Sequence, residues 1–266
     1  MKKYLTDSGL LTTIFIVAYL AWDWWNPMFI WCLLAVWVVN NTIPLIVHHH
    51  WAHRYTQPRF KWLGYILDLY AYAITVSGSK EYSNKAHWRY FHIKHHQLWK
   101  TEHDHIEYMI NHTHPLILWF GNTSMEVMPN AQHPLIIKQA KEQTFKDLTP
   151  LERWIDEHNP LIKFLIHLIF FLLFGWEIYF YILFIPAWSF KPWMHFFTET
   201  LAHWKKKQRE DEYNIPWLFP LLGDNAFHYS HHAERGVIHI GKGAWKYFHI
   251  NYWFIRLFYK QLVPMR

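Results

Sequence analysis

The sequence predicts an all-α integral membrane protein with four transmembrane helices and a cytosolic helical cap. Hydrophobic residues make up 52% of the chain and aromatic residues 20%, whereas only 17% are charged. This balance is typical of proteins at a lipid–water boundary. The apolar residues also gather in long stretches that are separated by short polar turns. The chain has 266 residues, a length that suits one domain, and we expect residues 1–266 to form a single domain.

The first pair of spans is expected near the N-terminus. Between Ser8 and Val47 the only charged residue is Asp23, and this stretch is far too long for a signal peptide. Around Asp23 lies a polar turn that contains proline and the Trp residues typical of membrane interfaces. The turn divides the stretch into spans at about 8–22 and 28–47.

A second pair of spans is expected at about 160–175 and 178–198, separated by a turn at Trp176 and Glu177. Neither this turn nor the one around Asp23 contains Lys or Arg. The positive-inside rule therefore places both short turns outside the cytosol.

The same rule assigns the long segments 48–159 and 199–266, and both termini, to the cytosol. Within the first of these segments, residues 62–78 are apolar apart from Asp68. A single crossing there would leave the His residues on either side of it on opposite faces of the membrane. We therefore expect an interfacial helix at 62–78.

Charge and cysteine content exclude several classes of function. The net charge of +6 is more typical of a surface facing an anionic membrane leaflet than of a nucleic-acid-binding protein, because the basic residues flank apolar spans. The single cysteine, Cys32, lies in an apolar run and provides neither a disulfide framework nor a Cys-based zinc or iron–sulfur site. Any metal site must use His and carboxylates.

The 22 His residues include four groups on the side assigned to the cytosol. The groups are His48-His49-His50 with His53, His92 with His95-His96, the single His203, and His228 with His231-His232.

Two of these groups have the spacing HxxHH. On a helix, residues three or four apart share a face and can bind one ion, whereas adjacent His residues point toward different ions. An all-imidazole site without Cys and with few carboxylates fits redox iron better than magnesium or calcium, although ligand type alone leaves zinc open.

These residues resemble the His boxes of the membrane-bound fatty acyl desaturases, particularly the Δ9 acyl-CoA and acyl-lipid branch, over about residues 44–257. Residues 48–54 resemble the HxxxxH box, with its Trp and trailing Arg, and residues 92–96 resemble the HxxHH box. The acidic, His-containing segment 101–105 is similar to the tail of that box. Gly223-Asp224 resembles the lead-in to the third box, here one residue longer.

The resemblance implies four spans, a cytosolic cap and two iron ions held by nine His residues. The matching residues are His48, His53, His92, His95, His96, His203, His228, His231 and His232. Two departures leave alternatives open. His49 could replace His48, and Glu199, where that branch has an Asn, could bind or approach an iron ion.

The resemblance further implies O2-dependent introduction of a cis double bond into a long acyl chain, carried by CoA, acyl carrier protein or a lipid. No flavin, haem or iron–sulfur motif is present in the sequence, so ferredoxin or cytochrome b5 is the expected electron donor. The expected location is a bacterial inner membrane or the endoplasmic reticulum, with the site on the cytosolic face. The alternatives are a related hydroxylase or monooxygenase acting on acyl chains, alkanes or carotenoids, and a His-rich membrane metal transporter.

Overall fold

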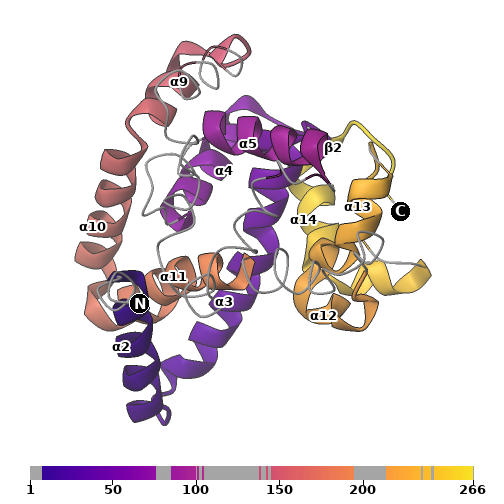
Figure 1. Cartoon of the computed structure of the whole chain (residues 1–266). Coiled ribbons are helices and arrows are strands. Elements are labelled where there is room, and N and C mark those ends of the chain that lie inside the picture. Colours follow the sequence, from indigo (N-terminus) through magenta and orange to yellow (C-terminus); the bar gives the residue numbers. More distant parts are fainter. Residues whose placement is uncertain are drawn as a thin grey trace.

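The structure is a computed structural model that describes residues 8–75, 85–99, 101, 104, 138, 142, 145–194, 214–234, 236–240 and 243–265. Of these residues 79% are helical and 4% lie in strands. The prediction of a mostly helical chain is therefore confirmed. In Figure 1, α3 crosses the middle of the molecule, α10 lies to one side of it, and α12 to α14 lie to the other.

The first two helices begin where the sequence predicts the first two spans. Helix α2 covers Ser8–Trp22 and α3 covers Met28–Pro44. The turn between them is held by Asn26, whose side chain donates to Asp23 Oδ2 at 3.1 Å and to Glu177 Oε1 at 3.0 Å. The hydroxyl of Tyr181 also donates to Asp23. The two predicted short turns therefore meet at the same end of the molecule.

The second hairpin breaks at the predicted turn. Helix α10, Asn159–Ile178, is interrupted at Gly175, which has φ 77° and ψ 177°. This conformation favours glycine, because an L side chain rarely adopts a positive φ. The π-helix η2, Tyr179–Phe184, then packs back against α10, and α11, Ile185–Trp193, packs against α3. Figure 1 shows α11 running from the foot of α10 toward α3.

Two helical stretches are long and apolar enough to cross a membrane, Met28–Ala52 and Asn159–Phe190. A shorter apolar helix covers Leu10–Trp22. The kink at Gly175 divides the second stretch into two arms, but four separate spans and their orientation remain predictions. Residues 195–198 of the last predicted span lie outside the described residues.

Beyond α3 the chain continues as the π-helix η1, Leu45–Ala52, followed by β1, Thr56–Pro58, and α4, Lys61–Ile74. Helix α4 has 14 residues, so it is only about 21 Å long and too short to cross a hydrocarbon core of about 30 Å. Residues 76–78 of the predicted interfacial helix are outside the described part of the chain.

Helix α10 caps the C-terminal end of α4. Lys163 Nζ donates to the carbonyl oxygen of Thr75 at 2.8 Å, and His167 Nε2 donates to that of Ala73 at 2.9 Å. The last carbonyls of a helix have no partner within it and carry partial negative charge. These two contacts therefore fix α4 against α10.

A buried polar network joins α4 to α5, Lys85–Leu98, and to α9, Pro150–Glu157. Lys85 Nζ donates to Asp68 Oδ2 at 3.2 Å and to Glu152 Oε1 at 3.4 Å. Trp51 Nε1, from η1, donates to the other oxygen of Asp68 at 2.7 Å. The network fixes the start of α5 relative to η1, and both helices carry predicted His boxes.

Asp156 accepts a hydrogen bond from the first turn of α5. Its Oδ1 accepts from the backbone N–H of Lys85 at 2.6 Å and from the hydroxyl of Tyr72 at 2.5 Å. Asp156 is fully buried, and burial raises the pKa of its carboxyl group from 3.8 to about 6, against the opposing effects of these hydrogen bonds and of Lys85.

This raised pKa predicts a fall in stability with rising pH. The folded state holds a proton on Asp156 between pH 4 and 6 that the unfolded state has lost, so stability is greatest below the unfolded pKa and falls as pH rises through the folded value. This difference between the folded and unfolded pKa values corresponds to about 3 kcal/mol at most. We expect Asp156→Asn, which keeps the Oδ1 acceptor, to remove this dependence. Melting temperatures measured from pH 4 to 7 should show the advantage of the variant over wild type growing with pH; a constant difference would contradict the prediction.

The C-terminal part of the chain consists of short elements packed beside α3. They are η4, Pro216–Leu218; α12, Phe219–Leu222; η5, Gly223–Phe227; α13, His228–Ala233; η6, Gly243–Phe248; α14, Ile250–Phe258; and β2, Tyr259–Gln261.

Strand β2 pairs antiparallel with β1, with Thr56 opposite Gln261 and Pro58 opposite Tyr259. Ile238 forms a parallel bridge with Met265. These pairings hold the C-terminal residues against the segment that follows η1. Buried side chains of η1, η5 and α14 share one hydrophobic core.

Candidate metal centre

The first predicted His box lies on a π-helix. In η1 the backbone N–H of His53 donates to the carbonyl oxygen of His48 at 3.0 Å, an i→i+5 hydrogen bond. A π-helix has i→i+5 hydrogen bonds, so residues five apart lie on neighbouring turns. The HxxxxH spacing therefore puts the rings of His48 and His53 on one face, with their centroids 4.9 Å apart. The turn ends at Arg54, which has φ 58°.

The second box lies on α5. His92 and His96 are four residues apart and share a face, and their Nε2 atoms are 3.0 Å apart. His95 lies on a neighbouring face, with its Nε2 3.3 Å from Nε2 of His232. The adjacent pair His95-His96 therefore points into two different groups, as the HxxHH spacing predicts.

The third box forms the short helix α13. His228 and His232 are four residues apart, with their Nε2 atoms at 3.1 Å, and all three His residues of this box are buried. His231 points instead toward the first box, with Nε2 2.9 Å from that of His48 and 3.1 Å from that of His53. The third box, like the second, contributes to both groups.

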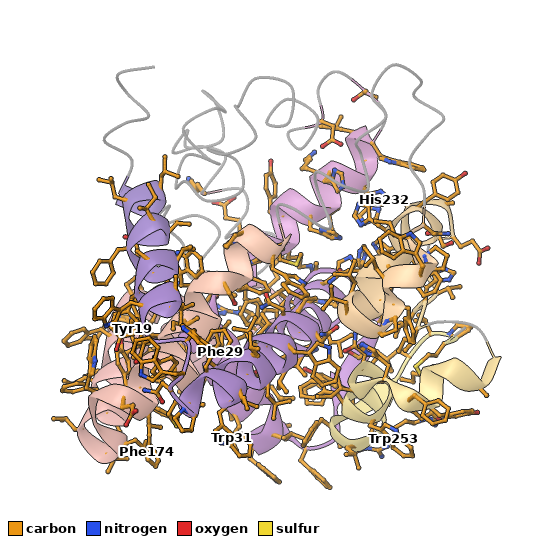
Figure 2. The ribbon with its side chains drawn as sticks, turned by 90° about the horizontal axis from the view of Figure 1, so that it is seen from below. Tyr19, Phe29, Trp31, Phe174, His232 and Trp253 are labelled. Atoms are coloured by element: carbon orange, nitrogen blue, oxygen red, sulfur yellow. The ribbon has the colours of Figure 1, made fainter. Side chains whose placement is uncertain are left out.

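The boxes converge on two adjacent groups of potential ligands. Each group has ligand atoms within 4.8 Å of one another. The five-His group contains His48, His53, His92, His96 and His231, and the three-His group contains His95, His228 and His232. The rings of His96 and His232 stack with centroids 4.4 Å apart, so the two groups touch. Figure 2 shows His232 beside many other nitrogen-bearing side chains.

His203 and Glu199 lie outside the described residues, so their roles stay predictions from the sequence. His48 belongs to the five-His group, whereas Nε2 of His49 lies 2.7 Å from Oδ2 of Asp224. His48, His49 and Asp224 form a third group of potential ligands.

The donor set suits a metal ion. Nε2 of His231 lies within 3.1 Å of Nε2 of His48, His53 and His96. A ring nitrogen carries at most one proton, so four nitrogens meeting in this way cannot all satisfy one another by hydrogen bonds. A cation between them would satisfy their lone pairs.

The protonation states agree with this. Burial, followed by the charges of neighbouring His residues, lowers the pKa of His92 and His231 well below the usual value. Both rings are therefore neutral at neutral pH, and neutral imidazole is the form that binds metals. Several His groups of this chain could thus hold a metal ion.

A carboxylate orients one ring of the three-His group. His95 Nδ1 donates to Asp104, at 2.9 Å from Oδ1 and 2.8 Å from Oδ2, and Asp104 is fully buried. With its proton on Nδ1, His95 presents the lone pair of Nε2 to His232 and the rest of the group. Metal-binding His residues commonly have such a carboxylate partner. In the sequence Asp104 was visible only as part of the acidic segment that follows the second box.

No protein-family model, curated protein or solved structure matches this chain. The resemblance to the desaturases therefore stands on the His boxes themselves, and any functional assignment has to be argued from the geometry of the two groups.

Proposed function

We propose that the protein is a di-iron, O2-dependent oxidoreductase that introduces a cis double bond into a long acyl chain. The observation that carries the proposal is the convergence of three sequence-distant His boxes into a five-His group and a touching three-His group. Two adjacent groups favour two metal ions, and neutral imidazole ligands without Cys favour redox iron.

The residues of the two groups would hold the ions, and the proposal includes His203 as the ninth ligand. Bound iron would supply the activation of O2 that removal of hydrogen from unactivated methylenes requires. The chain itself would orient the ligands, through Asp104 on His95, and keep bulk water away, since His95, His96, His228, His231 and His232 are all buried.

A membrane setting supports an acyl substrate. Large apolar side chains on the two candidate spans are uncovered, including Ile30 and Trp31 of α3 at 72% and 58% exposure and Leu173 of α10 at 71%. Figure 2 shows Trp31, Phe174 and Trp253 along one edge of the molecule and His232 well away from it. Exposed apolar patches of this extent favour contact with lipid. An acyl chain could then reach the His groups from the membrane.

Electrons would come from a separate redox protein, ferredoxin or cytochrome b5. Lys94 is exposed and lies next to His95 in the chain; Arg54, next to His53, is also exposed and already pairs with Asp147 at 2.7 Å. Basic side chains close to the centre favour an acidic partner, because complementary charge accelerates encounter. The proposal places this face in the cytosol, as the positive-inside rule predicts.

The decisive experiment combines metal analysis with product analysis. The purified protein should contain about two iron ions per chain, as two ligand groups imply, and consume O2 when it receives electrons and substrate. After expression in a host of known lipid composition, mass spectrometry should detect new cis-unsaturated acyl chains. A His92→Ala variant, which lacks a ligand, is the control for activity of the host.

Other products would point elsewhere. Hydroxylated acyl chains, alkanols or modified carotenoids would favour the related oxygenases. Zinc at full occupancy without O2 consumption would contradict a redox role. Metal transport in cells that is lost in His92→Ala, without any oxidation product from the wild-type protein, would favour a transporter.

A further inference from the structure

The triple His48-His49-His50 leaves the first box ambiguous, because His48 and His53 fit the spacing HxxxxH and His49 and His53 fit HxxxH. We propose that Asp224 resolves this choice by holding His49 away from the five-His group, so that His48 alone serves as the first ligand. The inference rests on the proposed metal-binding function. It makes Asp224 a positioning residue and His49 its target.

The contact between the two residues is short and buried. Nε2 of His49 donates to Oδ2 of Asp224 at 2.7 Å, and the two side chains are 2% and 4% exposed. With its proton on Nε2, His49 cannot offer that nitrogen to a metal. Within the described part of the chain, Nδ1 of His49 is buried and has no hydrogen-bond partner. His49 therefore keeps one ring nitrogen that could compete if the ring were released.

A second contact fixes Asp224 itself. Asn251 Nδ2, from α14, donates to Oδ1 of Asp224 at 2.7 Å, and Asn251 is fully buried. The approach of Asn251 requires glycine at position 223, where an added Cβ would lie 2.2 Å from Asn251 Nδ2. Gly223 also has φ 57°, a conformation that disfavours other residues. Both carboxylate oxygens are thus engaged, and the carboxylate cannot turn away from His49.

Release of His49 would place it within reach of the metal site. Its ring centroid is 4.7 Å from that of His48 and 6.2 Å from that of His231. Both are members of the five-His group. The backbone N–H of Tyr55 also donates to the carbonyl oxygen of His49 at 2.8 Å, so the backbone stays in place while the ring is free to rotate.

The test compares three variants by Co²⁺ titration of the metal-free protein, because the visible absorption of Co²⁺ reports ligand number and geometry. Asp224→Ala should weaken Co²⁺ binding about tenfold or more and alter the spectrum. His49→Gln alone should leave both unchanged. The double variant Asp224→Ala/His49→Gln should recover the wild-type spectrum and an affinity within about threefold of wild type.

Each other outcome overturns the inference. If the double variant binds Co²⁺ as weakly as Asp224→Ala does, Asp224 supports the structure of the site in general and does not act through His49. Loss of Co²⁺ binding in His49→Gln would make His49 a ligand. Three Co²⁺ ions per wild-type chain, with one lost in His49→Gln, would make His48, His49 and Asp224 an ion site of their own.

Two controls complete the design. In the metal-free state, Asp224→Ala and the double variant Asp224→Ala/His49→Gln should have the same melting temperature. Recovery of Co²⁺ binding in the double variant then reflects the metal site and not a recovery of folding. His48→Ala tests the metal centre itself: unchanged Co²⁺ binding there would refute the proposed function, whereas failure of the double variant refutes only the role of Asp224.

Discussion

Replacement of His231 by Ala is expected to abolish both metal binding at the five-His group and activity. Nε2 of His231 lies 2.9 Å from that of His48, 3.1 Å from that of His53 and 2.9 Å from that of His96. Its Nε2 therefore lies close to three other members of the group. Its removal takes a ligand from the centre of the group and leaves a buried gap.

Metal content measured by mass spectrometry should fall by at least half, and turnover by about 100-fold or more. The matched control is His158→Ala, since His158 is exposed just after α9. Its ring donates to the carbonyl oxygen of Trp154 and stacks on the Trp154 ring. This control should keep the wild-type metal content. Full metal occupancy in His231→Ala would rule out the five-His group as a metal site.

Local patterns in the sequence predict much of this arrangement. The turn at Asp23 separates α2 from α3, and Gly175 breaks the second hairpin, because polar and glycine residues interrupt long apolar runs. The HxxHH spacing predicts the shared face of His92 and His96, since it depends only on the helical repeat. Only the first box directly follows a predicted span, and convergence of the boxes was expected because all of them fall in segments that the positive-inside rule assigns to one face of the membrane.

Other features depend on tertiary contacts and leave no local signal. The spacing of His48 and His53 fits a π-helix, but the surrounding residues favour an ordinary α-helix as much, and packing decides the outcome. The pairing of His49 with Asp224 joins residues 175 positions apart. The sequence therefore left His48 and His49 as alternatives, and only their different neighbours in the folded chain distinguish them.

The contact between Asp104 and His95 also leaves no local signal in the sequence, although the two residues are close in the chain. Asp104 lies only nine positions from His95, in the acidic segment 101–105 that follows the second box. Which of its acidic or His side chains would turn back toward α5 depends on the path of the chain after Trp99. In the structure Asp104 lies against Nδ1 of His95 in α5.

Removal of the Asp104 carboxylate should weaken metal binding at the three-His group selectively. Asp104 fixes the proton of His95 on Nδ1, orients the ring, and makes Nε2 a stronger donor. Asp104→Ala would leave Nδ1 of a buried ring without this acceptor, which costs about 1–3 kcal/mol. We expect a loss of about 10–100-fold in affinity for one of the two metal ions. Asp104→Asn should lose less, because its carbonyl oxygen can still accept from Nδ1 while the negative charge is gone.

Chelator competition with Co²⁺ would resolve the two sites, one weakened and one unchanged. Asp147→Ala is the matched control, because Asp147 is an exposed carboxylate that pairs with Arg54 at 2.7 Å and with Arg89 at 3.4 Å and belongs to neither His group. Equal weakening of both sites in Asp104→Ala would mean that Asp104 supports the fold of the whole centre. Wild-type affinity at both sites would mean that His95 does not bind metal, since a ligand that loses its buried carboxylate cannot keep the same basicity and orientation.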